Sequence, residues 1–231
     1  MERGVVYSAI PNPTINSQRI IIGSGIGVFD SISPLEYQYP HLLNQNTTYY
    51  VRSYVYTENG NYTYGNDVSF KTLSIGQTGP GGGIVFFDKG VFSNGWRYLE
   101  AAPNDQSTGI GWGCNGISIP GTKLSVGSGE DNTGLIVAGC NVPSFAAKLC
   151  DNLTLGGQSD WFLPSINELN LMHKSLHLKG KGNFNNSRFY WSSTEYAKNN
   201  AWDFAFSIGQ PINYLNNNKG DINHVRAVRA F

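Results

Sequence analysis

The side chains best suited to recognising a ligand gather near the C-terminal end of the chain. Seven asparagines lie between residues 196 and 224, interleaved with Tyr, Ser, Gly, Asp and His. The same residue types dominate adaptable binding loops, where tyrosine supplies contact area and short polar side chains supply hydrogen bonds. Apolar Trp202, Phe204 and Phe206 alternate with polar or small residues, so one face of this strand can join a core while the other varies.

We therefore predict a ligand-binding surface within residues 196–224. The alternative is a solvated, turn-rich edge, because Asn and Gly favour turns. The candidate ligand-binding residues are Tyr196, Asn199, Asn200, Asp203, Ser207, Gln210, Asn213, Tyr214, Asn216, Asn217, Asn218, Asp221, Asn223 and His224.

Other pairs with chemical potential have structural explanations. His173 and His177 have the i, i+4 spacing of metal ligands, but no carboxylate or cysteine is placed to complete a site, so we interpret them as surface histidines. Glu168 and Glu195 could act as paired carboxylates. Glu168 is better explained as the capping partner of Ser165, and Glu195 as a structural hydrogen-bond acceptor. The sequence predicts no catalytic residue, no metal site and no cofactor.

Composition and charge exclude several classes of function. Sixteen Lys and Arg balance sixteen Asp and Glu, which leaves no overall basic footprint for nucleic acid. No apolar run approaches the roughly 20 residues of a membrane helix, and residues 1–7 lack the apolar region of a signal peptide. A local basic patch for anionic glycans would need Arg226, Arg229, Lys198 and Lys219 together, but the two arginines fall on opposite faces of an ideal strand.

Three cysteines, Cys114, Cys140 and Cys150, lie within 37 residues of one another. They allow three single disulfides, each of which leaves one thiol over. No pair has the C-x-x-C spacing of a zinc knuckle or a thioredoxin-like motif. We expect one local disulfide, with fully reduced buried thiols as the alternative.

Residues 1–73 are predicted to contain strands and turns only. The strands are expected around residues 4–8, 19–22, 27–30, 48–56 and 67–73. Asn59-Gly60 is a hairpin signal between the last two strands. This pattern is typical of an all-β sandwich.

This segment resembles a fibronectin type III-like module of bacterial surface proteins, through residues 3–8, 11–14, 46–54 and 64–70. In such modules a tyrosine forms a corner with the upstream loop, a role that the resemblance gives to Tyr49 or Tyr50. A module of this kind has about seven strands in roughly 90–100 residues. We therefore expect residues 1–73 to lack the first one or two strands, and another chain or a neighbouring segment to cover the open face.

A Gly-rich linker is expected at residues 74–83, followed by a domain at residues 84–231. That domain begins with strands at 84–88 and 95–102 and continues through a loop-rich stretch at 103–142. One helix follows Ser144, and a second begins at the capping box of Ser165. Four more strands are expected around residues 189–191, 201–207, 212–215 and 225–231. Two helices followed by a run of strands predict an α+β fold.

A spaced series of motifs runs through this domain: DWFLPS at 160–165, EL at 168–169, YWSSTE at 190–195, AW at 201–202 and VRAVR at 225–229. The series resembles the family of bacterial domains typified by the C-terminal domain of collagen-like adhesins, over about residues 80–231. It is also similar to variable proteins diversified by retroelements, such as phage tropism determinants. The resemblance implies a C-type-lectin-like fold whose C-terminal strands and loops present a binding surface encoded by mutable, adenine-rich Asn codons.

These observations favour a non-enzymatic ligand-binding or adhesion protein on a bacterial cell surface or a virion. Its expected partner is a glycan or a host surface protein, without nucleic acid and without membrane insertion. A homo-oligomer, or a larger parent chain or fibre, is expected to cover the open sandwich face. The alternatives are a structural spacer of a surface fibre and, on the same fold, a formylglycine-generating-like enzyme. The enzyme is disfavoured because its chemistry needs a reactive cysteine pair in the C-terminal half, and the last cysteine is Cys150.

Overall fold

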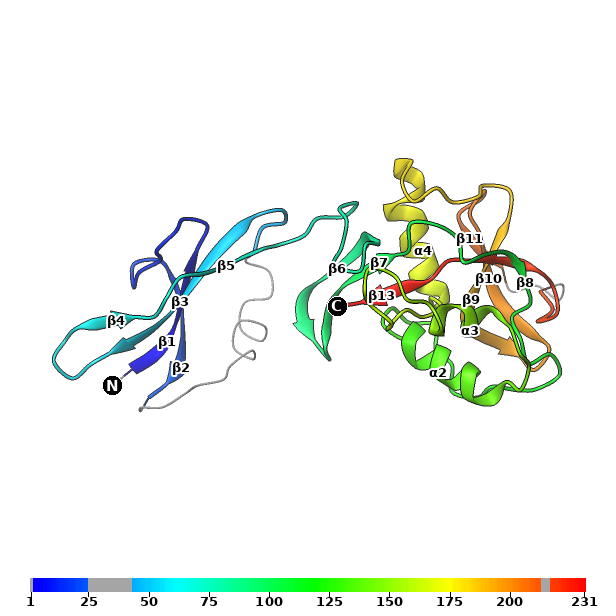
Figure 1. The fold of residues 1–231 in the computed structure, drawn as a ribbon, viewed down its shortest axis with the longest axis horizontal. Helices are drawn as coiled ribbons and strands as arrows, with labels where there is room; N and C mark the ends of the chain where they lie inside the picture. The colour runs from blue at the N-terminus through cyan, green and yellow to red at the C-terminus, as the bar shows by residue number, and fades with distance from the viewer. Residues whose placement is uncertain (1, 25–42, 213–216) are drawn as a thin grey trace. The chain divides into compact units, whose positions relative to one another are not determined.

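The computed structural model describes residues 2–24, 43–212 and 217–231 of the chain. Its backbone contacts divide it into two compact units, one comprising Met1–Ser74 and Lys89–Gly95 and the other Ile75–Asp88 and Trp96–Phe231 (Figure 1). Strands dominate the described residues, and helices are few. Within these ranges, no helix is long and apolar enough to cross a membrane.

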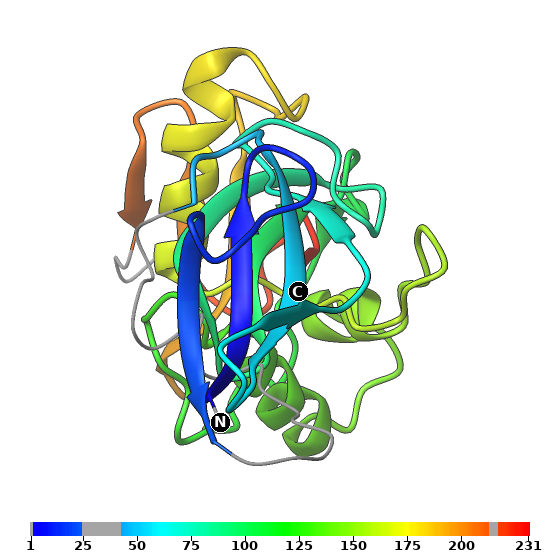
Figure 2. The same ribbon diagram turned by 90° about the vertical axis from the view of Figure 1, so that its left-hand side faces the viewer.

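The first unit is built on an antiparallel sheet rich in tyrosine and β-branched residues. Its strands are β1 (Glu2–Ser8), β2 (Gln18–Gly23), β3 (Thr48–Tyr56), β4 (Tyr62–Tyr64) and β5 (Val68–Lys71). The order is β2-β1-β3-β4, with β5 also paired to β3. Figure 2 shows β1, β2 and β3 side by side. The described residues before Ser74 form this one sheet, and the strand expected at 27–30 lies outside the described residues.

Two local signals of the first unit are confirmed. Gly60 has a φ of 80°, and its N–H donates to the Thr57 carbonyl at 3.1 Å, so the Asn59-Gly60 pair makes the predicted turn. The turn joins β3 to β4, a strand that was not predicted, and β5 is the expected later partner of β3. The Tyr49 hydroxyl accepts a hydrogen bond from the Asn44 backbone N–H at 2.9 Å. This bond assigns the expected tyrosine corner to Tyr49.

The second unit contains two sheets. A three-stranded sheet has the order β13-β7-β6, from β6 (Ile84–Ser93), of which residues 84–88 belong to this unit, β7 (Trp96–Ala101) and β13 (Val228–Ala230). A five-stranded sheet has the order β11-β10-β9-β12-β8, from β8 (Ser107–Ile110), β9 (Phe189–Ala197), β10 (Asn200–Ala205), β11 (Gln210–Ile212) and β12 (Asn223–Val225). β9 and β12 run parallel, and the other pairs in this sheet are antiparallel.

The single strand predicted at 225–231 is divided between the two sheets. β12 ends at Val225 and β13 begins at Val228. Between them, the Arg226 guanidinium donates to the Ala102 carbonyl at 3.1 Å, and the Ala227 carbonyl accepts from the Ala102 N–H at 2.9 Å. These contacts fix the chain where it passes from the five-stranded sheet to the three-stranded sheet. In the three-stranded sheet, β7 lies between β13 and β6.

Two of the three α-helices among the described residues match the predicted pair. These are α3 (Ala146–Asp151) and α4 (Ile166–Ser175), and α4 begins at the capping box formed by Ser165 and Glu168. A short 3₁₀ turn, η1 (His177–Lys179), follows α4. The third, α2 (Gly129–Gly139), lies in the stretch expected to be loop-rich, so that expectation is wrong. Its Ser128 N-cap makes no side-chain capping bond, and the Gly129 N–H donates to the Glu168 carboxylate at 3.4 Å.

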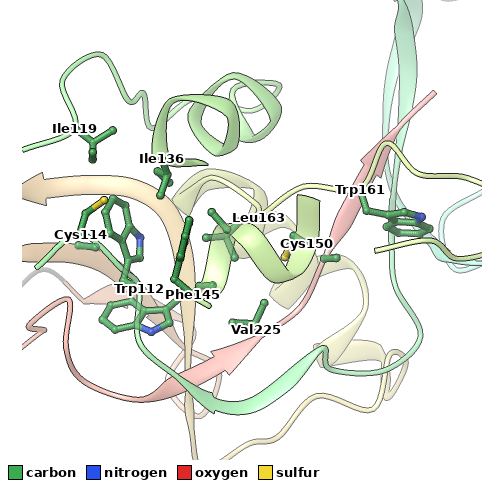
Figure 3. Packing of buried hydrophobic residues seen from close by; sticks show 14 of the residues in the cluster. Trp112, Cys114, Ile119, Ile136, Phe145, Cys150, Trp161, Leu163 and Val225 are labelled. Atoms are coloured by element: carbon green, nitrogen blue, oxygen red, sulfur yellow. The ribbon is translucent and has the colours of Figure 1, made fainter. Parts of the chain in front are cut away.

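Two buried clusters fill the second unit. One surrounds Trp112, Phe145 and Trp191, and Figure 3 shows the packing of this cluster. The other surrounds Leu169 and Phe204 beneath α4. Trp161 and Trp191 are both buried members of the first cluster.

Residues 79–83, the second half of the linker expected at 74–83, are packed into the second unit. The Gly81 and Gly83 N–H groups each donate to a carboxylate oxygen of Glu100 at 2.9 Å. Glu100 is fully buried and also accepts from the Arg229 guanidinium at 3.1 Å. A Cβ atom added at Gly81 would lie 2.6 Å from the Glu100 carboxylate, so glycine is required for this close approach.

The structure selects one of the three possible disulfides. Cys114 and Cys140 are bonded, with their Cα atoms 5.1 Å apart, and Cys150 remains a buried free thiol. The bond ties the segment after Trp112 to the end of α2. Burial raises the pKa of the Cys150 thiol above its usual range, as expected for an unreactive core cysteine.

Candidate binding surface

The predicted surface is organised by the β9–β10 hairpin and by the described residues that lead into β12, 217–222, which we call the return segment. Asn200 of the hairpin forms an isolated bridge with Asn218 of the return segment. The Lys219 N–H donates to the Asn199 carbonyl at 2.8 Å, and the Ala201 N–H donates to the Asn217 carbonyl at 3.3 Å. The hairpin tip and the return segment therefore lie together.

The sequence-predicted residues differ widely in exposure. Tyr196, Asn199, Ser207, Gln210 and Asp221 are exposed; Asn200, Asn217, Asn218 and Asn223 are half-buried; Asp203 and His224 are buried; Asn213, Tyr214 and Asn216 lie outside the described residues. The exposed and half-buried members are the ones that remain candidates for ligand contact.

Asp203 is buried, at 1% exposure, rather than outward-facing as expected. Its two carboxylate oxygens accept hydrogen bonds from the side-chain amides of Asn217 at 2.9 Å and Asn223 at 2.8 Å. Burial raises the pKa of Asp203 to about 7, against the opposing effect of the Asn223 bond. The expectation failed because Phe204 and Ala205 are also buried, so β10 is covered on both faces. Asp203 fixes the return segment.

His224 is also buried, which corrects its place among exposed candidates. Its Nδ1 lies 2.8 Å from Oδ2 of Asp105, which also accepts from the Tyr190 hydroxyl at 3.0 Å. Oδ1 of Asp105 accepts from Nε of Arg226 at 2.7 Å. Three side chains thus converge on one carboxylate, and His224 is a structural member of that network.

The exposed turn of the return segment is held by its own side chains. The Asn218 N–H donates to the Asp221 carboxylate at 2.9 Å, and the Gly220 N–H donates to the Asn218 side-chain oxygen at 2.8 Å. The Asp221 N–H in turn donates to the Asn218 carbonyl at 2.8 Å. Asn218 and Asp221 therefore combine a turn-forming role with partial exposure.

Lys219, in the middle of this polar segment, is a buried cation that the sequence argument missed. Its Nζ lies 2.6 Å from Oε1 of Glu195 and 2.8 Å from the Ile117 carbonyl oxygen. It also lies 4.5 Å from the centre of the Trp112 ring. Burial lowers the pKa of Lys219, and the hydrogen bond that it donates to Glu195 opposes this shift. Glu195 acts as the predicted structural acceptor, because it also accepts the Ile119 N–H at 2.7 Å.

The basic patch considered for anionic glycans does not form. Arg226, Arg229 and Lys219 are buried, and each contacts a carboxylate: Asp105, Glu100 and Glu195, respectively. Lys198 alone of the four is exposed.

The histidine pair lies against the core. His173 is buried among Phe204 and Phe206, so its interpretation as a surface histidine is wrong. Its ring centre is 5.2 Å from that of His177. Burial, and then the neighbouring His177, lower the pKa of His173. Within the described ranges, no group of three or more His, Cys, Asp or Glu residues is arranged to hold a metal ion.

Beside the hairpin lies an exposed segment, residues 115–118, within the stretch at 103–142 that was expected to be loop-rich. It follows the disulfide-bonded Cys114, and the Ile117 N–H donates to the Cys114 carbonyl at 3.0 Å. The Ser118 hydroxyl donates to Glu195 at 3.1 Å. The Asn115-Gly116 pair is a turn signal that could have located this loop, but nothing local indicates what lies next to it.

Comparisons with known proteins identify the family of this part of the chain. The family model for the Lcl C-terminal domain matches residues 102–229. No match was found among curated proteins. Among solved structures, the chain is similar to a fimbrial protein from Bacteroides ovatus, with 11% sequence identity and a TM-score of 0.49, over 100% of this chain and 65% of that chain. The family match spans more than half of the sequence and the whole surface just described; the chain belongs to the Lcl C-terminal domain family.

Proposed function

We propose that the protein is a non-enzymatic surface adhesin whose second unit binds a glycan or a host surface protein through the hairpin tip and the return segment. The observation that carries the proposal is the exposure of Tyr196 and Asn199 above a separately held scaffold. Tyr196 is 52% exposed, although its ring packs edge-on against Trp202 with centres 5.7 Å apart. An amphipathic ring held rigidly at a surface supplies contact area at a low entropic cost.

The scaffold below this surface supports a binding role because it is satisfied without the exposed side chains. Asn199 contributes its backbone carbonyl to Lys219, so its side chain can change without loss of that bond. Asp203 and Lys219 supply the internal polar contacts. A ligand can therefore select different residues at the exposed positions while the strands keep their pairing.

We propose an extracellular location, on a bacterial cell or a virion, and a C-type-lectin-like α+β fold for the second unit. The Cys114–Cys140 disulfide supports the location, because disulfides persist in oxidising compartments. The family match supports the fold together with the motif series at residues 160–229.

We propose further that a retroelement diversifies this surface. The support is the seven asparagines in residues 196–224, whose codons offer adenines for mutation. The flanking DNA tests the proposal: a near-identical repeat should differ at adenines in codons for exposed positions such as 196 and 199. The codon for the structural Asp203 should match in both copies. A flanking region without such a repeat would contradict diversification.

A spacer domain of a surface fibre is the second candidate. The internal bonding of Asn218 and Asp221 favours it, because a turn that satisfies itself needs no ligand.

An adhesion assay separates the two functions. Beads coated with the full chain should adhere to at least one member of a panel of bacterial and epithelial cells. The Tyr196→Ala/Asn199→Ala variant should lose that adhesion while its melting temperature stays within a few degrees, because surface substitutions cost about 0.5 kcal/mol or less. Beads that adhere to none of the cells would favour the spacer. Undiminished adhesion of the variant would place the binding surface elsewhere.

A further inference from the structure

The buried Lys219 ammonium joins three segments that are distant in the sequence. Lys219 is 1% exposed, although it lies between residues that are partly or fully exposed. Its side chain reaches the Ile117 carbonyl and the Glu195 carboxylate. Its backbone N–H donates to Asn199 at 2.8 Å, and its carbonyl accepts from Trp112 at 2.9 Å. Removing an ammonium from water is costly unless it is paired in this way, so these bonds fix its position.

The loop at residues 115–118 consequently lies against the hairpin and the return segment. Glu195, directly before Tyr196, accepts from both Ser118 and Ile119. A Cβ atom added at Gly116 would lie 4.0 Å from the Asn199 side-chain oxygen, and one added at Gly220 would lie 3.4 Å from the Asn115 amide nitrogen. The disulfide at Cys114 anchors the start of the loop. The three segments therefore form one continuous face.

This composite face has a distinct chemistry. Ile117 is 50% exposed and Tyr196 is 52% exposed. Around them, Asn115, Ser118 and Asn199 are uncharged hydrogen-bonding residues, and all three are exposed. The same segments also expose one charge of each sign, Lys198 and Asp221. Large apolar side chains inside a polar rim are the usual composition of a protein–protein interface. Tyr196 offers a flat ring, but the branched aliphatic Ile117 beside it does not, and the two together fit apolar pockets of a polypeptide better than a glycan.

We propose that residues 115–118 form part of the recognition face, with Lys219 as the positioning residue, and that the partner is a protein surface with apolar pockets for Ile117 and Tyr196. The inference rests on the proposed binding function and deepens it by naming the partner class and a further contact segment.

The test uses the immobilised full chain with two probes, a random-peptide phage library and a glycan array. Enriched peptides should lose about tenfold or more in affinity for Ile117→Asn and for Tyr196→Ala, as hot-spot residues do. The matched control is Leu178→Asn in η1, since Leu178 is an aliphatic residue with 63% exposure outside this face. The control should bind the peptides as the wild type does.

Lys219→Met tests the positioning role, because it keeps every exposed side chain of the face. It should weaken peptide binding and accelerate amide hydrogen exchange at residues 113–119, with exchange in α4 unchanged. Wild-type binding by this variant would overturn the role of Lys219. If the variant fails to fold, the Ile117 variant alone decides the proposal.

Three results would overturn the recognition face itself: no enriched peptide, enriched peptides indifferent to Ile117→Asn, or glycan binding that depends on Ile117 and Tyr196. If the coated beads adhere to cells but the peptides ignore Ile117, only this inference fails. If the beads do not adhere, the proposed function fails with it.

Discussion

Glu168 offers the sharpest test of how the second unit is held together. The residue is fully buried, and its carboxylate accepts the Ser165 N–H at 2.7 Å and the Gly127 N–H at 2.7 Å. The Gly129 N–H lies farther away, at 3.4 Å. One side chain thus begins α4 and also fixes the start of α2. We predict that Glu168→Ala is strongly destabilising and that Glu168→Gln has an intermediate effect.

The magnitude follows from the groups that each variant leaves behind. Glu168→Ala leaves the buried Ser165 donor without a partner, at about 1–3 kcal/mol, and the half-buried Gly127 donor with only solvent, at about 1 kcal/mol. The lost methylene contact adds roughly 0.8 kcal/mol. The total of about 3–5 kcal/mol corresponds to a fall in melting temperature of about 10 °C for a unit of this size. Glu168→Gln keeps one acceptor oxygen, so it should cost about 1–3 kcal/mol.

The effect of pH has a defined sign. Burial raises the pKa of Glu168 to about 7, above its ordinary value of 4.5, while hydrogen bonds from Ser165 and Gly127 oppose the shift. Stability from a group with a raised pKa is complete below its unfolded value and is lost as the pH rises through the folded value. Glutamine does not titrate, so the stability gap between wild type and Glu168→Gln should narrow between pH 5 and pH 8.

The assay is thermal unfolding of the full chain, followed by tryptophan fluorescence, with hydrogen exchange at residues 127–129 as a local readout. Glu130→Gln is the control, because Glu130 is an exposed carboxylate in the first turn of α2 and should change stability by about 0.5 kcal/mol or less. The reasoning would be refuted if the melting temperature of Glu168→Ala lay within about 2 °C of the wild type, or if Glu168→Gln were less stable than Glu168→Ala.

Three further predictions concern the candidate surface. Asp203→Asn should raise amide hydrogen exchange at residues 217–223 by about tenfold, because one amide oxygen cannot accept from both Asn217 and Asn223. Unchanged exchange would contradict the role of Asp203 in fixing the return segment. His224→Ala should lower the melting temperature by several degrees and Tyr196→Ala by about a degree or less; equal losses would show that the two residues do not differ in role. Reducing the Cys114–Cys140 bond, with a separation of 26 residues, should cost about 3 kcal/mol, and an unchanged melting temperature in reductant would count against this.

The elements predicted correctly are those whose signals are local. The capping box links Ser165 to Glu168 three residues away, and the Asn59-Gly60 turn is defined by two adjacent residues. Period-two alternation located β3, and the tyrosine corner joins Asn44 and Tyr49, which are five positions apart. Each of these depends on steric and hydrogen-bonding preferences that a short window contains.

The errors involve contacts that are distant in the sequence. α2 contains three glycines, Gly129, Gly134 and Gly139, which give no helical signal. Long-range bonds support it, such as the one from Asn132 to the Ser193 hydroxyl at 3.2 Å. The buried Lys219 ammonium donates a hydrogen bond to the Ile117 carbonyl, which lies 102 positions away in the sequence. A short stretch of sequence in the Asn-rich segment shows only that its residues are polar. Polar residues of this kind can be exposed or buried, so the sequence does not distinguish the two.

The difference between side-chain and backbone hydrogen bonds explains how a polar surface can tolerate variation. Side chains such as those of Asn217 and Asn223 bond to Asp203, so their replacement leaves a buried carboxylate short of partners. Asn199 instead holds the return segment through its backbone carbonyl, which every residue type supplies. Substitution at such a position changes what a ligand meets without changing what the strands require. An Asn-rich segment can therefore combine a fixed framework with a variable face, provided that the two sets of positions are separate.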